Sequence, residues 1–226
     1  MALIVAIDGP AGSGKSTAAR TLARAMGFLY VDTGAIYRAV ALKAKQSGID
    51  PTDPIALAAL VKSVRIEMQD GKPEQQILLD GVNITKQIRT ETISKMASKI
   101  SRYPEVRGGL LELQRKLGLA SDRGAVLEGR DIGTVVFPDA NLKFFLSASS
   151  EERAKRRFLE LQRGGENAAY SDVLTELTKR DRRDQEREVA PLVAAEDAIM
   201  IDTTGLSLEE VIAKIRQHID QYREQK

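Results

Sequence analysis

The sequence contains no cysteine and no tryptophan, and aromatic residues make up only 4% of its 226 residues. Without cysteine the chain can form neither a disulfide framework nor a thiolate metal site, which suits a reducing compartment. The scarcity of aromatic side chains argues against the stacking surfaces that bind single-stranded nucleic acid. The formal net charge is only +2. We therefore expect no nucleic acid and no membrane among the partners of this chain.

Long apolar runs are also absent. No stretch approaches the ~18 to 20 apolar residues that a membrane helix needs. The apolar residues 1–7 are too short for a signal sequence and are followed at once by Asp8, Gly9 and Pro10. We expect a cytoplasmic protein, and we expect it to be a monomer. With 42% hydrophobic and 29% charged residues, the chain is expected to form one domain, residues 1–226, with elaborations.

Alternating apolar and helical segments predict an α/β fold around a doubly wound parallel sheet. The apolar run 3–7 suits a strand covered on both faces, and residues 15–26 are typical of a helix ending at Gly27. A second strand and helix are expected over residues 28–31 and 34–47. Three further strands, which bring the parallel strands to five, are expected over residues 125–127, 142–146 and 198–201. Further helices are expected over residues 53–63, 91–101 and 104–117, and from near Ser149, Ser171 and Ser207. Capping-box spacing relates Ser149 to Glu152 and Ser207 to Glu210.

The region between the second and third predicted parallel strands has a different pattern. Residues 64–68 alternate in polarity, and residues 76–79 are mostly apolar. Asp70-Gly71 and Asp80-Gly81 mark turns. We therefore predict a small antiparallel insert here.

The strongest motif follows the first predicted strand. It consists of Gly9, Pro10, Ala11, Gly12, Ser13, Gly14, Lys15 and Ser16, followed by Thr17, and fits G-x-x-x-x-G-K-[ST] at every defined position. Its glycines let backbone N–H groups converge on phosphates, and the helix N-terminus adds partial positive charge. We expect these residues to bind ATP, with Lys15 reaching the β and γ phosphates and Ser16 offering its hydroxyl to Mg²⁺. The alternative, a glycine-rich turn with a surface lysine, is disfavoured by the flanking strand and helix.

A P-loop alone does not separate kinases from GTPases, ATPases and motors. Thr178-Lys179-Arg180-Asp181 matches a guanine-binding motif by letter. The match lies in a charged, helix-patterned stretch with no strand before it, so we interpret it as accidental.

Two constellations of charged residues follow predicted strands. Asp32 to Arg38 comes after the second strand, where an open parallel sheet presents residues to a ligand, and Arg38 is suited to pair bidentately with a phosphate. Glu128, Arg130 and Asp131 come after the third strand, and Glu128 is expected to assist the metal. The alternatives are a capped helix start with a solvent-exposed arginine and a structural salt-bridge loop.

The basic segments 153–157 and 179–188 are a further candidate. Arg180, Asp184 and Arg187 are spaced i, i+4, i+7, so a helix would place them on one face. Alone, such a segment is best interpreted as a solvated, self-paired helix. In a chain that also has a P-loop, we expect this segment to form a mobile lid. Its arginines would surround a phosphoryl group during transfer, and the lid would exclude water.

Together these motifs resemble the bacterial-type cytidylate kinases. The matching segments, residues 7–17, 32–38, 129–140, 149–153 and 187–192, run nearly from end to end. The resemblance implies a nucleoside monophosphate kinase fold with a P-loop core over residues 1–62, 120–161 and 191–226. It also implies a lid over residues 162–190 and a monophosphate-binding insert over residues 63–119.

The resemblance implies in addition an activity, the transfer of a phosphoryl group from ATP with Mg²⁺ to CMP or dCMP. By analogy the acceptor site comprises Thr33, Arg38, Ser98, Arg107, Arg130, Asp131, Arg180, Asp184 and Arg187. Arg38, Arg130 and Arg187 would hold the acceptor phosphate. Ser98, Arg107 and Asp131 would hold the cytosine edge, and Arg180 and Asp184 the sugar. The residues implied to act in catalysis are Lys15, Arg130, Arg180 and Arg187.

Two positions depart mildly from the family pattern. Thr33 stands where serine is frequent and Glu128 where aspartate is frequent, and both keep the functional group. The main alternative is another small-molecule P-loop kinase, acting on UMP, AMP or a metabolite alcohol. A nucleotide-gated binding protein or a GTPase is a more distant one.

Overall fold

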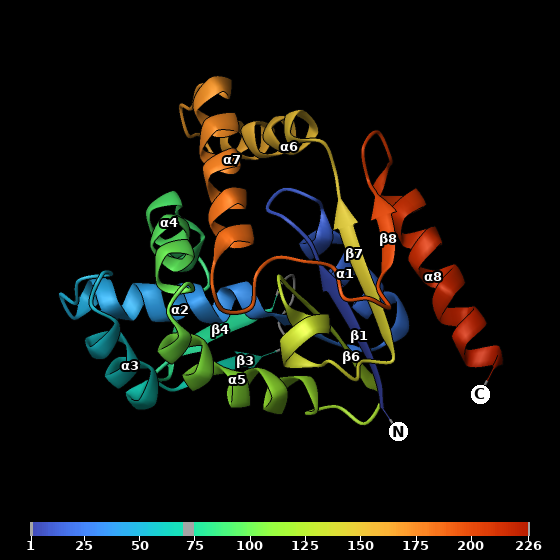
Figure 1. Cartoon of the computed structure of the whole chain (residues 1–226), viewed down its shortest axis with the longest axis horizontal. Helices are drawn as coiled ribbons and strands as arrows, with labels where there is room; N and C mark the ends of the chain where they lie inside the picture. The colour runs from blue at the N-terminus through green and yellow to red at the C-terminus, as the bar shows by residue number, and fades with distance from the viewer. Residues whose placement is uncertain (1, 70–74, 226) are drawn as a thin grey trace. The chain divides into compact units, whose positions relative to one another are not determined.

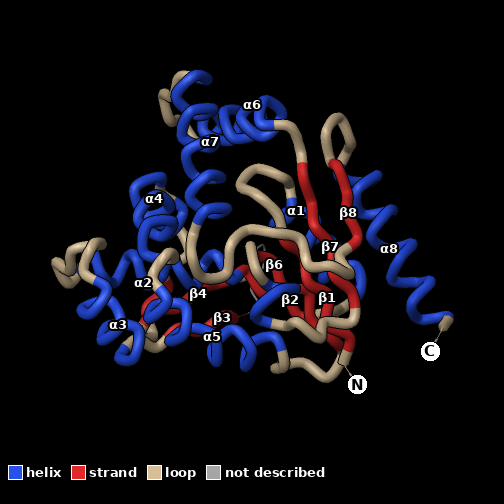
Figure 2. The backbone as a smooth tube through the Cα atoms, viewed as in Figure 1, coloured by secondary structure: helices blue, strands red, loops and turns tan. Residues whose placement is uncertain are grey.

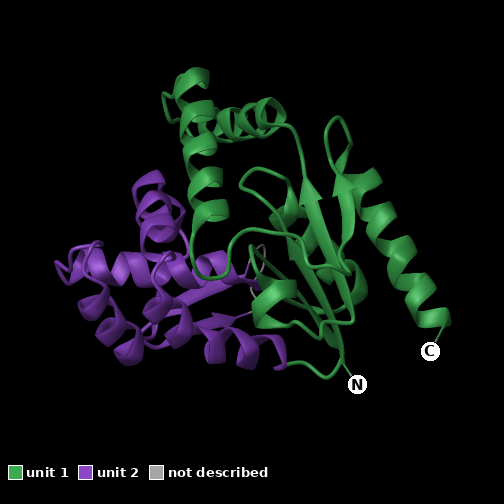
Figure 3. Cartoon of the chain, viewed as in Figure 1, with its two compact units in different colours: residues 1–30, 121–226 green, residues 31–120 purple. Residues whose placement is uncertain are grey.

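The computed structural model describes residues 2–69 and 75–225, which form two compact units (Figure 3). Unit 1 comprises Met1–Tyr30 and Ser121–Lys226, and unit 2 comprises Val31–Ala120. Each unit has its own hydrophobic core. Within the described ranges, no helix has both the length and the apolar character required to span a membrane.

Parallel strands form the centre of unit 1 (Figure 1). They are β1 (Leu3–Asp8), β6 (Gly124–Gly129), β7 (Leu142–Ser147) and β8 (Ile199–Asp202). Strand β2 (Leu29–Asp32) completes a five-stranded sheet in the order β2-β6-β1-β7-β8. Strand β1 pairs in parallel with β6 and β7, and Val5, Ala6 and Ile7 are fully buried, as the continuous apolar run predicts. The prediction of a parallel five-stranded sheet is confirmed.

Helices α1 (Lys15–Met26) and α8 (Leu208–Glu224) cover the sheet of unit 1. Leu22 of α1 and Ile215 of α8 lie in one buried cluster with Phe144 of β7. Figure 1 shows α8 running beside β8. Helix α1 ends, as predicted, at Gly27, whose φ of 66° lies in the left-handed region that glycine tolerates best.

Only one of the two predicted capping boxes is complete. Ser207 and Glu210 exchange both hydrogen bonds at the start of α8. At the start of α6 (Ser150–Arg163) the Ser149 hydroxyl accepts from the N–H of Glu152, but the return bond is replaced. The Glu152 carboxylate accepts from Arg156 instead, and the N–H of Ser149 donates to the hydroxyl of Thr204. A competing cation and a nearby hydroxyl thus satisfy the groups that the box would have paired.

Helices α6 and α7 (Tyr170–Glu186) pack together beyond the carboxyl end of β7 (Figure 1). A small apolar cluster including Leu161, Val173 and Leu177 joins them. A buried ion pair between Arg153 of α6 and Asp181 of α7 adds a polar link. Residues 178–181, which match a guanine-binding motif by letter, lie within α7 as their helical pattern predicts, and Asp181 belongs to this helix-packing contact.

Unit 2 combines helices with a small antiparallel sheet (Figure 2). The predicted antiparallel insert is confirmed, with β3 (Ile66–Gln69) pairing with β4 (Gln76–Leu79). A short strand that was not predicted, β5 (Val82–Asn83), extends this sheet. Asp80 and Gly81 join β4 to β5 with φ values of 51° and 83°, the conformation of a tight hairpin turn. The predicted turn at Asp70-Gly71 lies outside the described residues.

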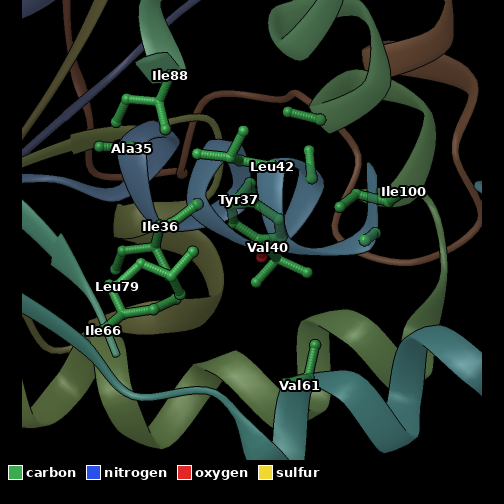
Figure 4. Packing of buried hydrophobic residues seen from close by; sticks show 14 of the residues in the cluster. Ala35, Ile36, Tyr37, Val40, Leu42, Val61, Ile66, Leu79, Ile88 and Ile100 are labelled. Atoms are coloured by element: carbon green, nitrogen blue, oxygen red, sulfur yellow. The ribbon is translucent and has the colours of Figure 1, made fainter. Parts of the chain in front are cut away.

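The helices of unit 2 surround α2 (Thr33–Gln46). They are α3 (Pro54–Ser63), the 3₁₀ turn η1 (Gln87–Arg89), α4 (Glu91–Ile100) and α5 (Pro104–Gly118). Ile36, Tyr37 and Val40 of α2 lie in the core with Leu79 and Ile100 (Figure 4). The predicted insert 63–119 lies within unit 2, and its role, like that of the predicted lid, stays a prediction.

The Arg153–Asp181 pair generates a stability prediction. Arg153→Ala would leave the Asp181 carboxylate buried without its cation, so we expect it to lower the free energy of unfolding by about 3 to 5 kcal/mol. Arg182→Ala, one residue after Asp181 on α7, is the control, because the Arg182–Glu186 pair is exposed and should contribute no more than about 0.5 kcal/mol. Denaturant unfolding measures both. Similar losses in the two variants would contradict the role of the buried pair.

Candidate active site

The predicted P-loop joins strand β1 to helix α1 (Figure 2). Two of its glycines occupy positions where any other residue would force the neighbouring atoms to move. A Cβ atom on Gly9 would lie 2.1 Å from the carbonyl oxygen of Leu146. Gly12 has a φ of 77°, and a Cβ atom there would lie 3.0 Å from the Cβ of Arg153. The loop is thus packed closely between β7 and α6, with the first turn of α1 directly after it.

Lys15 is buried at the start of α1, where its ammonium group donates to the carbonyl of Pro10 at 3.0 Å. Burial, assisted by the positive charge of Arg130, lowers the pKa of Lys15 to about 7, while the carboxylate of Glu128 opposes this shift. The charged form of Lys15 is thus disfavoured by its surroundings, and a nearby anionic ligand would stabilise it. Ser16 and Thr17 follow on the exposed side of the helix start.

Strand β6 ends in the predicted charged constellation. Glu128 is buried, and its carboxylate accepts from the hydroxyl of Tyr30 at 3.2 Å. The guanidinium of Arg130 donates from Nε to Asp184 at 3.0 Å. Asp131 is buried and lies 3.9 Å from the guanidinium of Arg187. Because the chain continues from β6 directly into these residues, the strand end fixes where their side chains begin.

Asp184 of α7 lies close to arginines that were predicted to bind the acceptor. Arg130 contacts its carboxylate at 3.0 Å and Arg180 at 4.0 Å. Burial alone would raise the pKa of Asp184, but the guanidinium groups of Arg130, Arg180 and Arg187 hold it below its usual value. The structure thus brings together, within unit 1, five of the predicted acceptor-site residues: Arg130, Asp131, Arg180, Asp184 and Arg187.

The helical-face argument for Arg187 is wrong. Helix α7 ends at Glu186, and Arg187 follows it with an extended backbone, at φ −67° and ψ 140°. Its Nε donates to the carbonyl of Ala190, which has a φ of 52°. Arg187 therefore comes close to Asp131 through the turn after the helix, whereas Arg180 and Asp184 do share a helical face, one turn apart.

The remaining predicted acceptor residues lie in unit 2, where Asp32 organises the start of α2. One carboxylate oxygen caps the helix by accepting from the N–H of Ala35 at 2.9 Å, and the other accepts from Arg38 at 2.8 Å. Arg89 approaches the second oxygen at 3.7 Å. Burial opposes ionisation, but Arg38 and Arg89 keep the pKa of Asp32 below its usual value. Thr33 is buried beside this cap.

Ser98 and Arg107 are both buried. Arg107 donates to the carbonyl of Ser101 at 3.1 Å, and its guanidinium carbon lies 5.5 Å from the ring centre of Tyr37. The hydroxyl of Ser98 has no hydrogen-bond partner in the part of the chain that the structure describes. The contact between Arg107 and the ring of Tyr37 was not predicted from the sequence, although Tyr37 is adjacent to Arg38 in α2.

Ser16 and Glu128 suit Mg²⁺ in donor chemistry, because a hydroxyl and a carboxylate are hard oxygen ligands. Over residues 2–69 and 75–225, no group of three or more histidine, cysteine, aspartate or glutamate side chains could hold a metal ion.

Sequence reasoning also missed the role of Asp8, the last residue of β1. Its oxygens accept from the N–H groups of Ile132 at 2.9 Å and Gly133 at 2.8 Å. These residues begin η2 (Ile132–Val136), a single π-helical turn that was not predicted. Despite these bonds and the charge of Lys15, burial and the neighbouring Asp131 raise the pKa of Asp8 to about 6.

This raised pKa predicts a specific pH dependence of stability. Between pH 4 and pH 6 the folded chain binds the Asp8 proton more tightly than the unfolded chain, so the contribution of this residue falls as pH rises. A rise from 3.8 to about 6 corresponds to about 3 kcal/mol. We expect the free energy of unfolding of wild type, relative to Asp8→Asn, to fall by about that amount between pH 4 and pH 7.

Asp197→Asn is a control of opposite sign. The pKa of Asp197 is lowered, chiefly by its hydrogen bond from Lys143. Wild type should therefore gain stability relative to this variant as pH rises. Denaturant unfolding at several pH values gives both difference curves, and a flat or rising curve for Asp8→Asn would disprove the raised pKa.

Comparisons with known proteins place these observations in a family. The cytidylate kinase family model matches residues 5–221. A cytidylate kinase of Desulfitobacterium hafniense is 49% identical over 213 residues, which cover 94% of this chain and 90% of that protein. A cytidylate kinase of Pasteurella multocida is 46% identical over 222 residues, which cover 96% and 97%.

Among solved structures, an uncharacterized protein from Eubacterium ventriosum is similar in fold, with a TM-score of 0.54 at 14% identity. The match covers 98% of this chain and 99% of that one. The similarity of sequence extends over the P-loop, both charged strand ends and α7. The resemblance inferred from the motifs is thus confirmed, and the chain belongs to the cytidylate kinase family.

Proposed function

We propose that the chain transfers the γ-phosphoryl group of ATP to CMP or dCMP, giving ADP and CDP or dCDP. The observation that carries this proposal is that Lys15 and the arginines of unit 1 lie close to carboxylates at the end of β6, Glu128 and Asp131, and to the carboxylate of Asp184 in α7. Phosphoryl transfer needs this arrangement, because catalysis rests on positioning and on neutralising phosphate charge.

The donor phosphates would be bound by the P-loop, residues 9–17. Its backbone N–H groups and the start of α1 favour negative charge, and Lys15 adds a cation that is already in the loop. When bound, Mg²⁺ neutralises charge on the donor phosphates, and we propose that Ser16 and Glu128 support it. The buried position of Lys15 strengthens its interaction with phosphate, since water screens it poorly.

We propose that the acceptor phosphate replaces carboxylates as the partner of the arginines. Arg130 lies 3.0 Å from Asp184 and Arg187 lies 3.9 Å from Asp131, so carboxylates orient both guanidinium groups. A phosphate offers the same bidentate geometry to guanidinium as a carboxylate does, with more charge. We propose the same exchange for Arg38, which Asp32 holds in unit 2.

No strong general base is needed for this reaction. A nucleoside monophosphate already presents anionic oxygens near neutral pH, so the residues named here act by alignment and charge stabilisation. We propose that Asp131, and separately Ser98 and Arg107, recognise the cytosine, and that Arg180 and Asp184 hold the sugar. A cytoplasmic location and a monomeric state remain predictions.

The donor assignment predicts the effect of Lys15→Ala. Removing this cation should reduce kcat by at least ~10²-fold, because one preorganised charge contact with the transferred group is lost. A coupled ADP-release assay with ATP and CMP measures the effect. Lys214→Ala on α8, where the lysine is exposed, should leave turnover within about twofold. Turnover of Lys15→Ala within threefold of wild type would contradict the donor site.

The acceptor is tested with a panel of CMP, dCMP, UMP and AMP in the same assay. Cytosine presents an N4 amino donor where uracil presents an acceptor, so a carboxylate favours CMP. The mismatched polar contacts should favour CMP over UMP by on the order of 10²-fold in kcat/KM. Asp131→Ala should lose CMP activity far more than residual UMP activity. Equal use of CMP, UMP and AMP by wild type would favour the alternative of a less selective kinase.

A further inference from the structure

We propose that Asp8 is a positioning residue for the acceptor loop. By binding the first two N–H groups of η2, it fixes the backbone from which Arg130 and Asp131 project. The same residue immediately precedes the P-loop, so one side chain ties the acceptor loop to the donor loop. This inference rests on the proposed function, since it assigns a role in the use of CMP.

The contact is two-pronged and buried. One carboxylate oxygen of Asp8 accepts from Ile132 at 2.9 Å and the other accepts from Gly133 at 2.8 Å. Two bonds from one planar group fix both the position and the orientation of the peptide segment. Asp8 itself cannot drift, because it ends β1 and pairs in register with Gly129 of β6. Its side chain is only 5% exposed, so water offers the two N–H groups little alternative.

The turn transmits this anchoring to the residues before it. The carbonyl of Asp131 accepts from the N–H groups of Val135 at 2.9 Å and Val136 at 3.1 Å. The carbonyl of Ile132 accepts from Phe137 at 2.7 Å. The peptide of Asp131 is thus held by η2, while the open N–H end of η2 is held by Asp8. A π-helical turn is rare and favours functional sites, which fits a segment shaped to aim side chains.

Lys143 closes the opposite side of this turn. A Cβ atom on Gly133 would lie 3.1 Å from the Cδ of Lys143, so the lysine stem packs directly against the glycine. The ammonium group of Lys143 is turned away to Asp197, at 2.9 Å. Gly133 is therefore confined between a lysine stem and the Asp8 carboxylate. The contacts of Gly133 with Asp8 and with the Lys143 stem therefore restrict the position of this loop.

The two N–H groups need two acceptor oxygens on one side chain, which an ionised aspartate supplies. Burial raises the pKa of Asp8 to about 6, which means that the ionised group is held at a cost. A neutral residue would avoid this cost but could not accept from both N–H groups in the same way. Asparagine keeps the size and one acceptor oxygen of aspartate, and it places its NH₂ group against the second N–H.

The test is the kinetics of Asp8→Asn beside Asp197→Asn as the matched control. We expect Asp8→Asn to raise KM for CMP by about 10- to 100-fold and to lower the CMP to UMP ratio of kcat/KM at least about fivefold. The Kd of ATP, measured without acceptor, should stay within about threefold. Asp197 is a surface carboxylate on the other side of the same loop, and its variant should keep all three values within about twofold.

The outcomes separate this inference from the proposed function. If wild type phosphorylates neither CMP nor dCMP, the proposed function fails. If wild type is active and Asp8→Asn keeps its KM for CMP and its base ratio, or loses ATP affinity and CMP affinity equally, the positioning role is wrong. Should Asp8→Asn fail to fold, Asp8→Ser, which is uncharged and keeps one acceptor, answers the same kinetic question.

A measurement on wild type is independent of turnover. The amide hydrogens of Ile132 and Gly133 should exchange far more slowly than those of exposed loops, because both are bound to a buried carboxylate. Rapid exchange at both positions would overturn the anchoring on which the inference depends.

Discussion

Unit 1 is organised by the need to pair buried charges at the carboxyl ends of β1 and β6. An ion removed from water without a partner costs several kcal/mol, so buried ions must occur in compensating sets. Here Asp8 accepts two N–H groups, Lys15 donates to a carbonyl, and Arg130 pairs with Asp184. The parallel sheet makes this possible, because it brings both strand ends to one edge, where loops rather than packed faces meet.

The same pairing prepares the cations for phosphate. An unpartnered arginine would either remain in water and lose its orientation or be buried at high cost. A carboxylate partner holds the guanidinium in place and can be replaced by a phosphate of similar geometry. Asp184 does this for Arg130 and Arg180 in unit 1, and Asp32 does it for Arg38 and Arg89 in unit 2. Under the proposed function, these ion pairs orient the arginines that bind phosphate.

Local patterns were sufficient to predict much of this chain. The five parallel strands, the P-loop and the start of α8 depend on apolar runs, glycines and caps within a few residues of each other. What was missed depends on long-range partners: η2 is held by Asp8, more than 120 residues away in sequence, and Arg153 is paired across two helices. The prediction that Arg187 shares a helical face with Arg180 and Asp184 failed for a local reason. Helix α7 ends at Glu186, one residue before Arg187.

Asp8 and Asp32 show why a sequence motif can identify a functional segment without revealing the hydrogen bonds that position its side chains. Each carboxylate uses its two oxygens for different groups: Asp8 for two successive N–H groups, Asp32 for a helix cap and an arginine. In both cases the residues expected to bind substrate are held through the backbone or side chain that the carboxylate fixes. Under the proposed function, Asp8 and Asp32 would position the substrate without touching it, because the orientation of a side chain depends on the peptide that carries it.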